Sequence, residues 1–322
     1  MRDKKFHKGP RPPSRPASGR GSPGPGHHGG KKRPEKPEKS GNSHPASHQT
    51  SHQTSHQTSG PVSSGSGFWL YGIHAVQAAL SNPRRKLGRA LLTPRALEQV
   101  GAKLLARVPH EIAEPGAIAR LLPPGAVHQG VALEARPLKA PDLEAVIAAP
   151  SPLGRRIVLV LDQLSDPHNV GAILRTAAAF GVTAVVVQDR HAPPQSGALA
   201  KAASGALDMV PYVEVVNIAR ALDILAAHDF WRIALEGPHK GSSGGETTAI
   251  TDAVSGGDVA LVLGSEGAGL RRLVREHCDS GAFIPIHAAM ESLNVSNAAA
   301  IALYELRREA AQNSAATVLA PE

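Results

Sequence analysis

Short runs of aliphatic residues alternate with amphipathic stretches in the second half of the chain. The stretch that begins at Val170 repeats its apolar residues at the i, i+3, i+4, i+7 and i+8 spacing of a helix that buries one face. The aliphatic runs have the length and the flanking turn residues of buried strands, at 157–161, 182–187, 210–215, 231–235, 259–263 and 282–286. This alternation predicts an α/β fold whose mostly parallel sheet is covered by helices on both faces.

A smaller pattern of the same kind precedes this one. It predicts a short helix entered through Gly72, a strand at 89–92, a helix led by Pro94, an amphipathic stretch to Leu122 and a strand at 130–135. We therefore expect a small α/β domain, a linker that contains three prolines, a larger α/β domain and a C-terminal tail, at residues 68–138, 139–155, 156–312 and 313–322.

Residues 1–66 differ from the rest of the chain in composition and charge. This segment contains 12 Lys or Arg and 3 Asp or Glu, a net charge of +9, whereas the whole chain carries +8. The net positive charge therefore lies entirely in this segment. Because it is rich in Pro, Gly, Ser and His and poor in large aliphatic residues, we expect a disordered basic tail. Its Lys and Arg clusters favour sequence-independent attraction to nucleic-acid phosphates, and a purely solubilising tail explains the same composition nearly as well.

A Ser-His-Gln-Thr repeat in this tail begins at Ser47, Ser51 and Ser55. Its histidines recur every four residues, a spacing that on a helix would align them for a metal ion. Ser, Thr and nearby Pro disfavour a helix, so we interpret the repeat as a solvated spacer. We expect no metal site in the folded part either, because no cluster of Cys and His there has ligand spacing.

Cysteine content and hydropathy indicate the compartment. Cys278 is the one cysteine of the chain, so no intrachain disulfide can form, and its place at an expected helix end indicates packing rather than reactivity. No apolar run approaches the length that spans a membrane, and the basic N-terminus lacks the apolar segment of a signal peptide. We expect a cytoplasmic protein with no membrane partner.

Three motifs share one physical form, an apolar strand followed by a loop of small and hydrogen-bonding residues and then a helix start. Such loops lie at the carboxyl ends of strands, where open α/β sheets place their ligand sites, so the three are expected to converge on one site. They read Leu-Asp-Gln-Leu-Ser-Asp-Pro-His-Asn-Val-Gly-Ala-Ile-Leu-Arg-Thr-Ala from Leu161, Leu-Val-Leu-Gly-Ser-Glu-Gly-Ala-Gly-Leu from Leu261, and Ile-Pro-Ile-His-Ala-Ala-Met-Glu-Ser-Leu-Asn-Val-Ser-Asn-Ala from Ile284.

Two other functions use residues of the kinds found in these motifs. The glycine-rich loop 264–269 invites a dinucleotide-binding interpretation, but that arrangement opens its fold and needs further strand-helix units after the loop. Fewer than sixty residues follow here, which disfavours it. Ser292 invites a hydrolase interpretation, but no Gly-x-Ser-x-Gly surrounds it and no evident His–Asp pair accompanies it, so acyl transfer is disfavoured.

In their order, their spacing and their residues, the three motifs resemble those of the SpoU (TrmH-like) family of SPOUT methyltransferases, and the resemblance covers about residues 70–312. It implies a C-terminal SPOUT domain with a trefoil knot, which holds the methyl donor, and a homodimer that pairs through this domain. It also implies transfer of a methyl group from S-adenosylmethionine to a ribose 2′-hydroxyl in RNA.

The small N-terminal domain narrows the expected substrate. Its opening Tyr-Gly-Ile-His-Ala-Val and closing Ala-Val-His-Gln-Gly-Val-Ala-Leu resemble the RNA-binding domain of the family's ribosomal RNA branch, which implies a guanosine in 23S ribosomal RNA. Transfer RNA is the alternative substrate, and a non-catalytic RNA-binding or ribosome-assembly factor is the alternative from another class. We expect His74 and His128 to hydrogen-bond within the fold or to touch RNA rather than to act in catalysis.

The resemblance also implies roles for individual residues. The family's polar active-site positions match Asn169, Arg175, Glu266, Ser292 and Asn294, and its donor-contacting positions match Gly264, Ile284 and Leu293. Arg175 is the family's candidate for activating the hydroxyl. Because an arginine is always protonated, we favour a role in which it grips a neighbouring phosphate and polarises the hydroxyl.

Two local features of these motifs leave questions open. Asn169 lies at an expected helix start, where capping of the helix and contact with the substrate are both compatible with its position. The chain has Ile284-Pro285-Ile286-His287-Ala288 where the family commonly has Ile-Pro-Met-x-Gly. This departure predicts a slightly altered loop near the donor and leaves every polar site residue in place.

Overall fold

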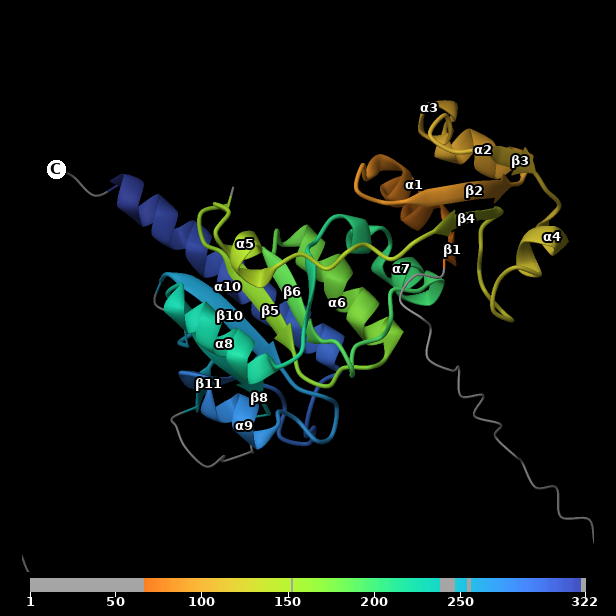
Figure 1. The fold of residues 1–322 in the computed structure, drawn as a ribbon. Helices are drawn as coiled ribbons and strands as arrows, with labels where there is room; N and C mark the ends of the chain where they lie inside the picture. Colours follow the sequence, from red (N-terminus) through yellow and green to blue (C-terminus); the bar gives the residue numbers. More distant parts are fainter. Residues whose placement is uncertain (1–66, 152, 238–246, 254–255, 320–322) are drawn as a thin grey trace, which may run out of the picture. The chain divides into compact units, whose positions relative to one another are not determined.

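The computed structural model describes residues 67–151, 153–237, 247–253 and 256–319, with side chains up to residue 310 (Figure 1). The expected disordered tail at 1–66, with its repeat and its basic clusters, lies outside the described residues. Two sheets organise the described chain, one of four strands and one of seven.

The four-stranded sheet has the order β1-β4-β2-β3. Strand β4 pairs antiparallel with β1 and β2, and β3 adds to β2 in parallel. The expected helices start where the sequence places them, after Gly72 with its φ of 87° and after Thr93, whose hydroxyl accepts a hydrogen bond from the amide of Ala96. The elements are β1 Phe68–Tyr71, α1 Ile73–Ser81, β2 Leu87–Leu92, α2 Pro94–Val100, α3 Ala102–Leu105, β3 His110–Ile112, α4 Pro115–Ala119 and β4 Val131–Ala135.

The seven-stranded sheet has the order β7-β6-β5-β10-β8-β11-β9, and all its pairings are parallel. This confirms the predicted α/β fold. Strand β9 was not expected. The strands are β5 Ile157–Leu161, β6 Ala184–Gln188, β7 Tyr212–Val215, β8 Phe230–Glu236, β9 Thr247–Ala249, β10 Asp258–Leu263 and β11 Ser280–Phe283.

Helices cover both faces of this sheet, as Figure 1 shows. Alternate residues of β5 face opposite sides: Leu159 packs in the hydrophobic cluster that includes α6, α7 and α10, and Val158 packs in the cluster that includes α5 and α8. The helices are α5 Leu143–Ile147, α6 Pro167–Ala179, α7 Gly197–Ala203, the 3₁₀ helix η1 Ala206–Asp208, α8 Ile218–Ala227, α9 Arg272–Glu276 and α10 Val295–Leu319.

Two segments differ from what the sequence pattern indicated. The connection at 139–155 contains α5, whose Leu143 and Ile147 are buried against the large sheet, because a single helical turn suffices to bury two aliphatic side chains. The last helix, α10, continues past residue 312, where we expected a tail to begin, and ends at Leu319. Within the described ranges, none of the helices has both the length and the apolar character needed to cross a membrane.

Candidate active site

The three motif loops meet at one edge of the large sheet because their strands are neighbours. Strand β5 pairs with β10, β10 with β8, and β8 with β11, all in the same direction. The last residues of β5 and β10, Leu161 and Leu263, are opposite each other in the register. The loops that follow these strands therefore begin side by side, as expected for a site at the carboxyl ends of parallel strands.

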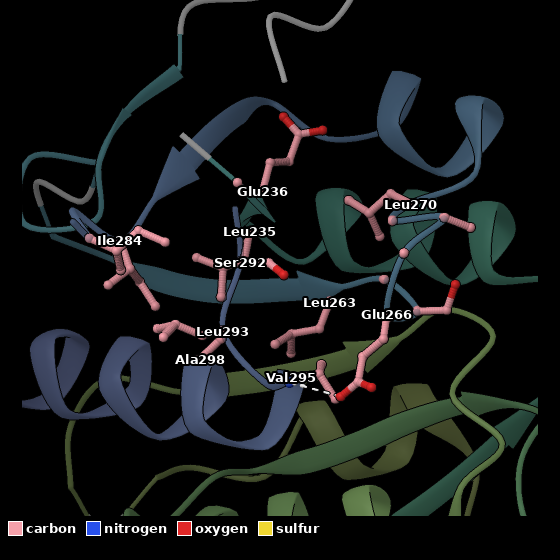
Figure 2. A pocket seen from close by; sticks show the side chains of 17 residues that line it. Leu235, Glu236, Leu263, Glu266, Leu270, Ile284, Ser292, Leu293, Val295 and Ala298 are labelled. Carbon is pink, nitrogen blue, oxygen red and sulfur yellow. Dashed lines mark hydrogen bonds between the residues drawn. The ribbon is translucent and has the colours of Figure 1, made fainter. Parts of the chain in front are cut away.

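A polar cluster joins one side chain from each motif. The Glu266 Oε1 atom accepts hydrogen bonds from Asn294 Nδ2 at 2.8 Å and from Asn169 Nδ2 at 3.3 Å. Asn294 Nδ2 also lies 3.0 Å from Asn169 Oδ1, and the amide of Val295 donates to Glu266 Oε1 at 3.3 Å (Figure 2). The oxygen Glu266 Oε1 is thus the shared acceptor that joins the second motif to the first and the third.

Asn169 reaches this cluster because another residue caps its helix. The carboxylate of Asp166 accepts hydrogen bonds from the amides of His168 at 3.2 Å and Asn169 at 3.1 Å, and Pro167 takes the first helical position. Of the two roles left open for Asn169, the capping role is therefore wrong. Its side chain lies in the first turn of α6 and contacts Glu266 and Asn294 instead.

A pocket of about 230 Å³ lies beside the cluster. Its walls hold all three expected donor-contacting residues, Gly264, Ile284 and Leu293, together with Glu266 and Ser292 (Figure 2). The described residues that line it include two carboxylates, Glu236 and Glu266, and no Lys, Arg or His. The lining therefore offers no cationic side chain to a phosphate group, and this pocket suits a neutral or cationic ligand with apolar parts.

The loop after β10 explains why residue 264 is glycine. A Cβ atom at Gly264 would lie 2.2 Å from the carbonyl carbon of Gly269 and 2.4 Å from the nitrogen of Leu270. The loop closes on itself at this point, since the amide of Gly269 donates to the carbonyl of Ser265 at 2.9 Å. A side chain at position 264 would push this turn apart and change the wall of the pocket.

Sequence reasoning missed an ion pair that fastens this loop. The buried carboxylate of Asp162, directly after β5, accepts from the backbone amide of Arg271 at 3.0 Å and from its guanidinium Nε at 2.8 Å. The amide of Asp162 in turn donates to the carbonyl of Leu263 at 2.8 Å. The available signal was an acidic residue at the end of a strand that is otherwise aliphatic.

Arg175 lies apart from the cluster in this chain. It is exposed on α6, and its side chain makes no hydrogen bond or ion pair with another described residue. Gly171, one helical turn earlier on the same face, packs against α7, because a Cβ atom there would lie 2.4 Å from Ala202 Cβ. Arg175 therefore projects from the side of α6 that faces α7. Ser292 lines the pocket without a hydrogen bond to the described residues.

Other candidate groups lie outside the pocket lining. His287 is exposed, and its Nδ1 accepts from the amide of Ala289 at 3.2 Å. His128 Nδ1 accepts from the amide of Gly130 at 3.1 Å, whereas His74 is exposed. Burial raises the pKa of the Cys278 thiol to about 12, which agrees with packing rather than reactivity. No group of three or more His, Cys, Asp or Glu in the described ranges is arranged to hold a metal ion.

Comparison with known proteins places this geometry in a family. A model of the SpoU rRNA Methylase family matches residues 156–304, and a model of the RNA 2′-O ribose methyltransferase substrate-binding domain matches residues 69–141. The 23S rRNA (guanosine-2′-O-)-methyltransferase RlmB of Escherichia coli K12 is 35% identical over 251 residues, which cover 74% of this chain and 98% of that protein. The chain belongs to the SpoU rRNA methylase family.

Further relatives agree with this membership. RlmB of Xylella fastidiosa is 44% identical over 188 residues, covering 58% of this chain and 72% of that protein. The AdoMet-bound rRNA methyltransferase of Sinorhizobium meliloti shares the fold with a TM-score of 0.61 at 23% identity, over 75% of this chain and 87% of that chain. The predicted SpoU family, its SPOUT fold and its enzyme class, RNA 2′-O-methyltransferase, are confirmed.

Proposed function

We propose that the protein transfers the methyl group of S-adenosylmethionine to the ribose 2′-hydroxyl of a guanosine in 23S ribosomal RNA. The observation that carries this proposal is the joining of Asn169, Glu266 and Asn294 beside the pocket lined by Gly264 and Leu293. The names of the curated relatives, which are 23S rRNA (guanosine-2′-O-)-methyltransferases, support the substrate.

The chemistry of the pocket supports the methyl donor. S-adenosylmethionine, when bound, supplies an electrophilic methyl group on a positively charged sulfur. Ile284 and Leu293 offer apolar surface to its nucleoside, and the backbone at Gly264 allows close approach. The described lining residues include no Lys, Arg or His that would repel the cationic sulfur, and Glu266 adds a carboxylate, whereas the carboxylate of Glu236 is paired with Arg275 at 3.1 Å. Methyl transfer from this sulfur requires no Lewis acid, so we expect no metal requirement.

The polar residues act on the ribose. Asn169, Glu266, Ser292 and Asn294 orient the hydroxyl in line with the methyl group, which lowers the barrier by positioning. Arg175 lies six residues beyond Asn169, about 9 Å along the axis of α6, and its side chain makes no hydrogen bond with the cluster. We assign Arg175 to the phosphate next to the target ribose, where its planar guanidinium holds two oxygens and polarises the hydroxyl. The proton of the hydroxyl leaves late in the reaction or is taken up by water.

The two regions that the family models match have different proposed roles. We propose that residues 68–138 form the RNA substrate-binding domain and that residues 156–312 form the methyltransferase domain, which carries a trefoil knot. The basic segment 1–66 adds sequence-independent attraction to phosphates. Ribosomal RNA is made and modified in the cytoplasm of bacteria, and we place the protein there.

We also propose a homodimer. On α10, Ile301 and Tyr304 lie one helical turn apart and remain 40% and 54% exposed in the single chain. Large apolar side chains on one face of a helix favour burial against a partner. Light scattering on the active protein tests this directly. A monomeric mass together with full activity would contradict it.

Deleting the gene and mapping 2′-O-methyl groups in the ribosomal and transfer RNA of the strain tests the proposed function. We expect one 2′-O-methylguanosine to disappear from 23S rRNA and to return when the gene is restored. A loss confined to transfer RNA would contradict the proposed substrate. Unchanged methylation in both RNA classes would favour a non-catalytic RNA-binding role.

Activity of the purified protein in the presence of a chelator tests the metal-free mechanism.

A further inference from the structure

Buried polar side chains gather where the four-stranded unit contacts the methylase region. Six polar or charged residues are buried among those that the structure describes, and four of them belong to this one cluster. Asn82 and Arg85 come from the segment between α1 and β2, whereas Gln195 precedes α7 and Asp208 ends η1. The cluster therefore joins the region matched by the substrate-binding model to the region matched by the SpoU methylase model.

An ion pair forms the centre of this cluster. The Arg85 Nε and Nη2 atoms donate to Asp208 Oδ1 at 2.8 Å and to Asp208 Oδ2 at 2.9 Å, in a bidentate arrangement. The exposed fractions of the two side chains are 0% and 2%. Asn82 Nδ2 adds a hydrogen bond to Asp208 Oδ1 at 3.0 Å. Bidentate geometry fixes orientation as well as distance, so this pair restrains how the two regions meet.

Gln195 attaches the start of the connecting chain to the same cluster. Its Oε1 accepts from the amide of Leu138 at 2.8 Å, and its Nε2 donates to the carbonyl of Leu138 at 2.9 Å. Arg85 Nη1 donates to the carbonyl of Arg136 at 3.1 Å and to Gln195 Oε1 at 3.3 Å. The chain is therefore held where it leaves the small domain, which limits rotation about the connection.

Backbone contacts close to α7 add to this restraint. A Cβ atom at Gly197 would lie 2.3 Å from the carbonyl oxygen of Trp69, and one at Gly205 would lie 3.0 Å from that of His74. Lys201, on α7, donates to Gln129 Oε1 at 2.5 Å. The small domain thus packs on α7, and Gly171 of α6 contacts the same helix. Arg175, four residues after Gly171, projects from that side of α6.

We propose that the Arg85–Asp208 ion pair is a lock that holds the substrate-binding domain in one orientation on the methylase domain. Arg85 and Asp208 are positioning residues: they act through the RNA that the small domain binds, by presenting its target ribose to Asn169 and Arg175. A buried ion pair is suited to this role because its energetic benefit over apolar packing is small, whereas its geometry is specific. This inference rests on the proposed function and identifies how the substrate is oriented.

The variant Arg85→Met keeps much of the side-chain volume and removes the charge, and Asp208→Asn is the milder change should Arg85→Met fail to fold. Arg232→Met is the matched control, because Arg232 also forms a bidentate pair, with Asp279, but within the large sheet. Spin labels on Lys103→Cys and Arg220→Cys, both exposed, report the distance between the two domains in a Cys278→Ser background. Each preparation is also tested for S-adenosylmethionine affinity and for single-turnover methylation of ribosomal RNA.

We expect a narrow distance distribution in the parent and in Arg232→Met, and a broad one in Arg85→Met and Asp208→Asn. At saturating RNA, the single-turnover rate of the two lock variants should fall by about ten- to a hundredfold, while donor affinity stays nearly unchanged. If the distance distribution stays narrow in Arg85→Met and Asp208→Asn proteins that fold, the ion pair does not fix the domain orientation and the proposal is overturned. A distribution that is already broad in the parent overturns it as well. A broadened distribution with a normal rate overturns its role in positioning. Failure of the parent to methylate RNA rejects the proposed function, while the distances still test the lock.

Discussion

The buried carboxylate of Asp162 holds Arg271 through both its backbone amide and its guanidinium. The distances are 3.0 Å to the amide nitrogen and 2.8 Å to Nε, and the Asp162 side chain is fully buried. This pair connects the end of β5 to the chain that leaves the glycine-rich loop after β10. The wall of the proposed donor pocket is therefore held in place by two residues that do not line the pocket.

Changing Asp162→Asn should weaken donor binding although Asp162 does not line the pocket. An amide cannot match the charge of Arg271, so the loop 264–270 becomes less fixed, and we expect the Kd for S-adenosylmethionine to rise about tenfold, equivalent to ~1.4 kcal/mol. Calorimetry measures this. Asp279→Asn, which disturbs an ion pair at another position of the sheet, is the control. A lower melting temperature with normal donor affinity would show that Asp162 serves stability alone.

Gly264→Ala should abolish measurable donor binding in a protein that still folds. The added methyl group would meet the backbone of Gly269 and Leu270 at 2.2–2.4 Å, so the turn must open and the pocket wall must move. Gly116→Ala is the matched control, because a Cβ atom there meets nothing within 4 Å. Titration with S-adenosylmethionine compares the two variants. Normal affinity in Gly264→Ala would show that this wall of the pocket does not contact the donor.

Arg175→Lys should remove most of the turnover while leaving donor binding nearly intact. Lysine keeps the charge but lacks the planar fork that holds a phosphate through two oxygens, so we expect single-turnover methylation to fall by about two orders of magnitude. Saturating donor and RNA separate chemistry from binding. Arg220→Lys, on the exposed side of α8, is the control. Glu266→Ala should also reduce turnover, but it is a less specific probe because Glu266 and its loop line the pocket, so we expect donor affinity to fall as well. A near-normal rate in Arg175→Lys would remove this arginine from the mechanism.

Removing residues 1–66 should leave folding and donor affinity unchanged and weaken RNA binding modestly. This segment carries a net charge of +9, and each phosphate contact by Lys or Arg releases counterions, so the dependence of affinity on salt should become less steep. Filter binding at several salt concentrations measures the slope for the full chain and the truncated chain. Equal slopes would assign the segment a role other than contact with RNA.

The central sheet could be predicted from the sequence because strands buried on both faces appear as aliphatic runs. The β5 residues are all apolar and all buried, and the predicted bounds 157–161 match the strand. Strands β3 and β9 could not be predicted in this way. The three residues of β3 are exposed and those of β9 only partly buried, so their strand conformation depends on pairing with β2 and β11 rather than on their own composition.

The members of the polar cluster could be named from the motifs, but their contacts could not be. Asn169 and Asn294 are 125 residues apart, and their hydrogen bond depends on the pairing of β5, β10, β8 and β11, which periodicity does not reveal. The sequence does not determine which residue caps the start of α6. Asp166 and Asn169 are both capping residue types, and only the course of the backbone decides which side chain reaches the free amides.

Methylation of purified RNA tests the central claim most directly. The full-length protein is incubated with methyl-labelled S-adenosylmethionine and either unmodified 23S rRNA or unmodified transfer RNA, and each RNA is digested to nucleosides. With the parent protein we predict labelled 2′-O-methylguanosine from 23S rRNA. With the Arg175→Lys variant we predict that this labelled nucleoside is lost. Label on a base, label in transfer RNA alone, or no transfer to either RNA would contradict the account.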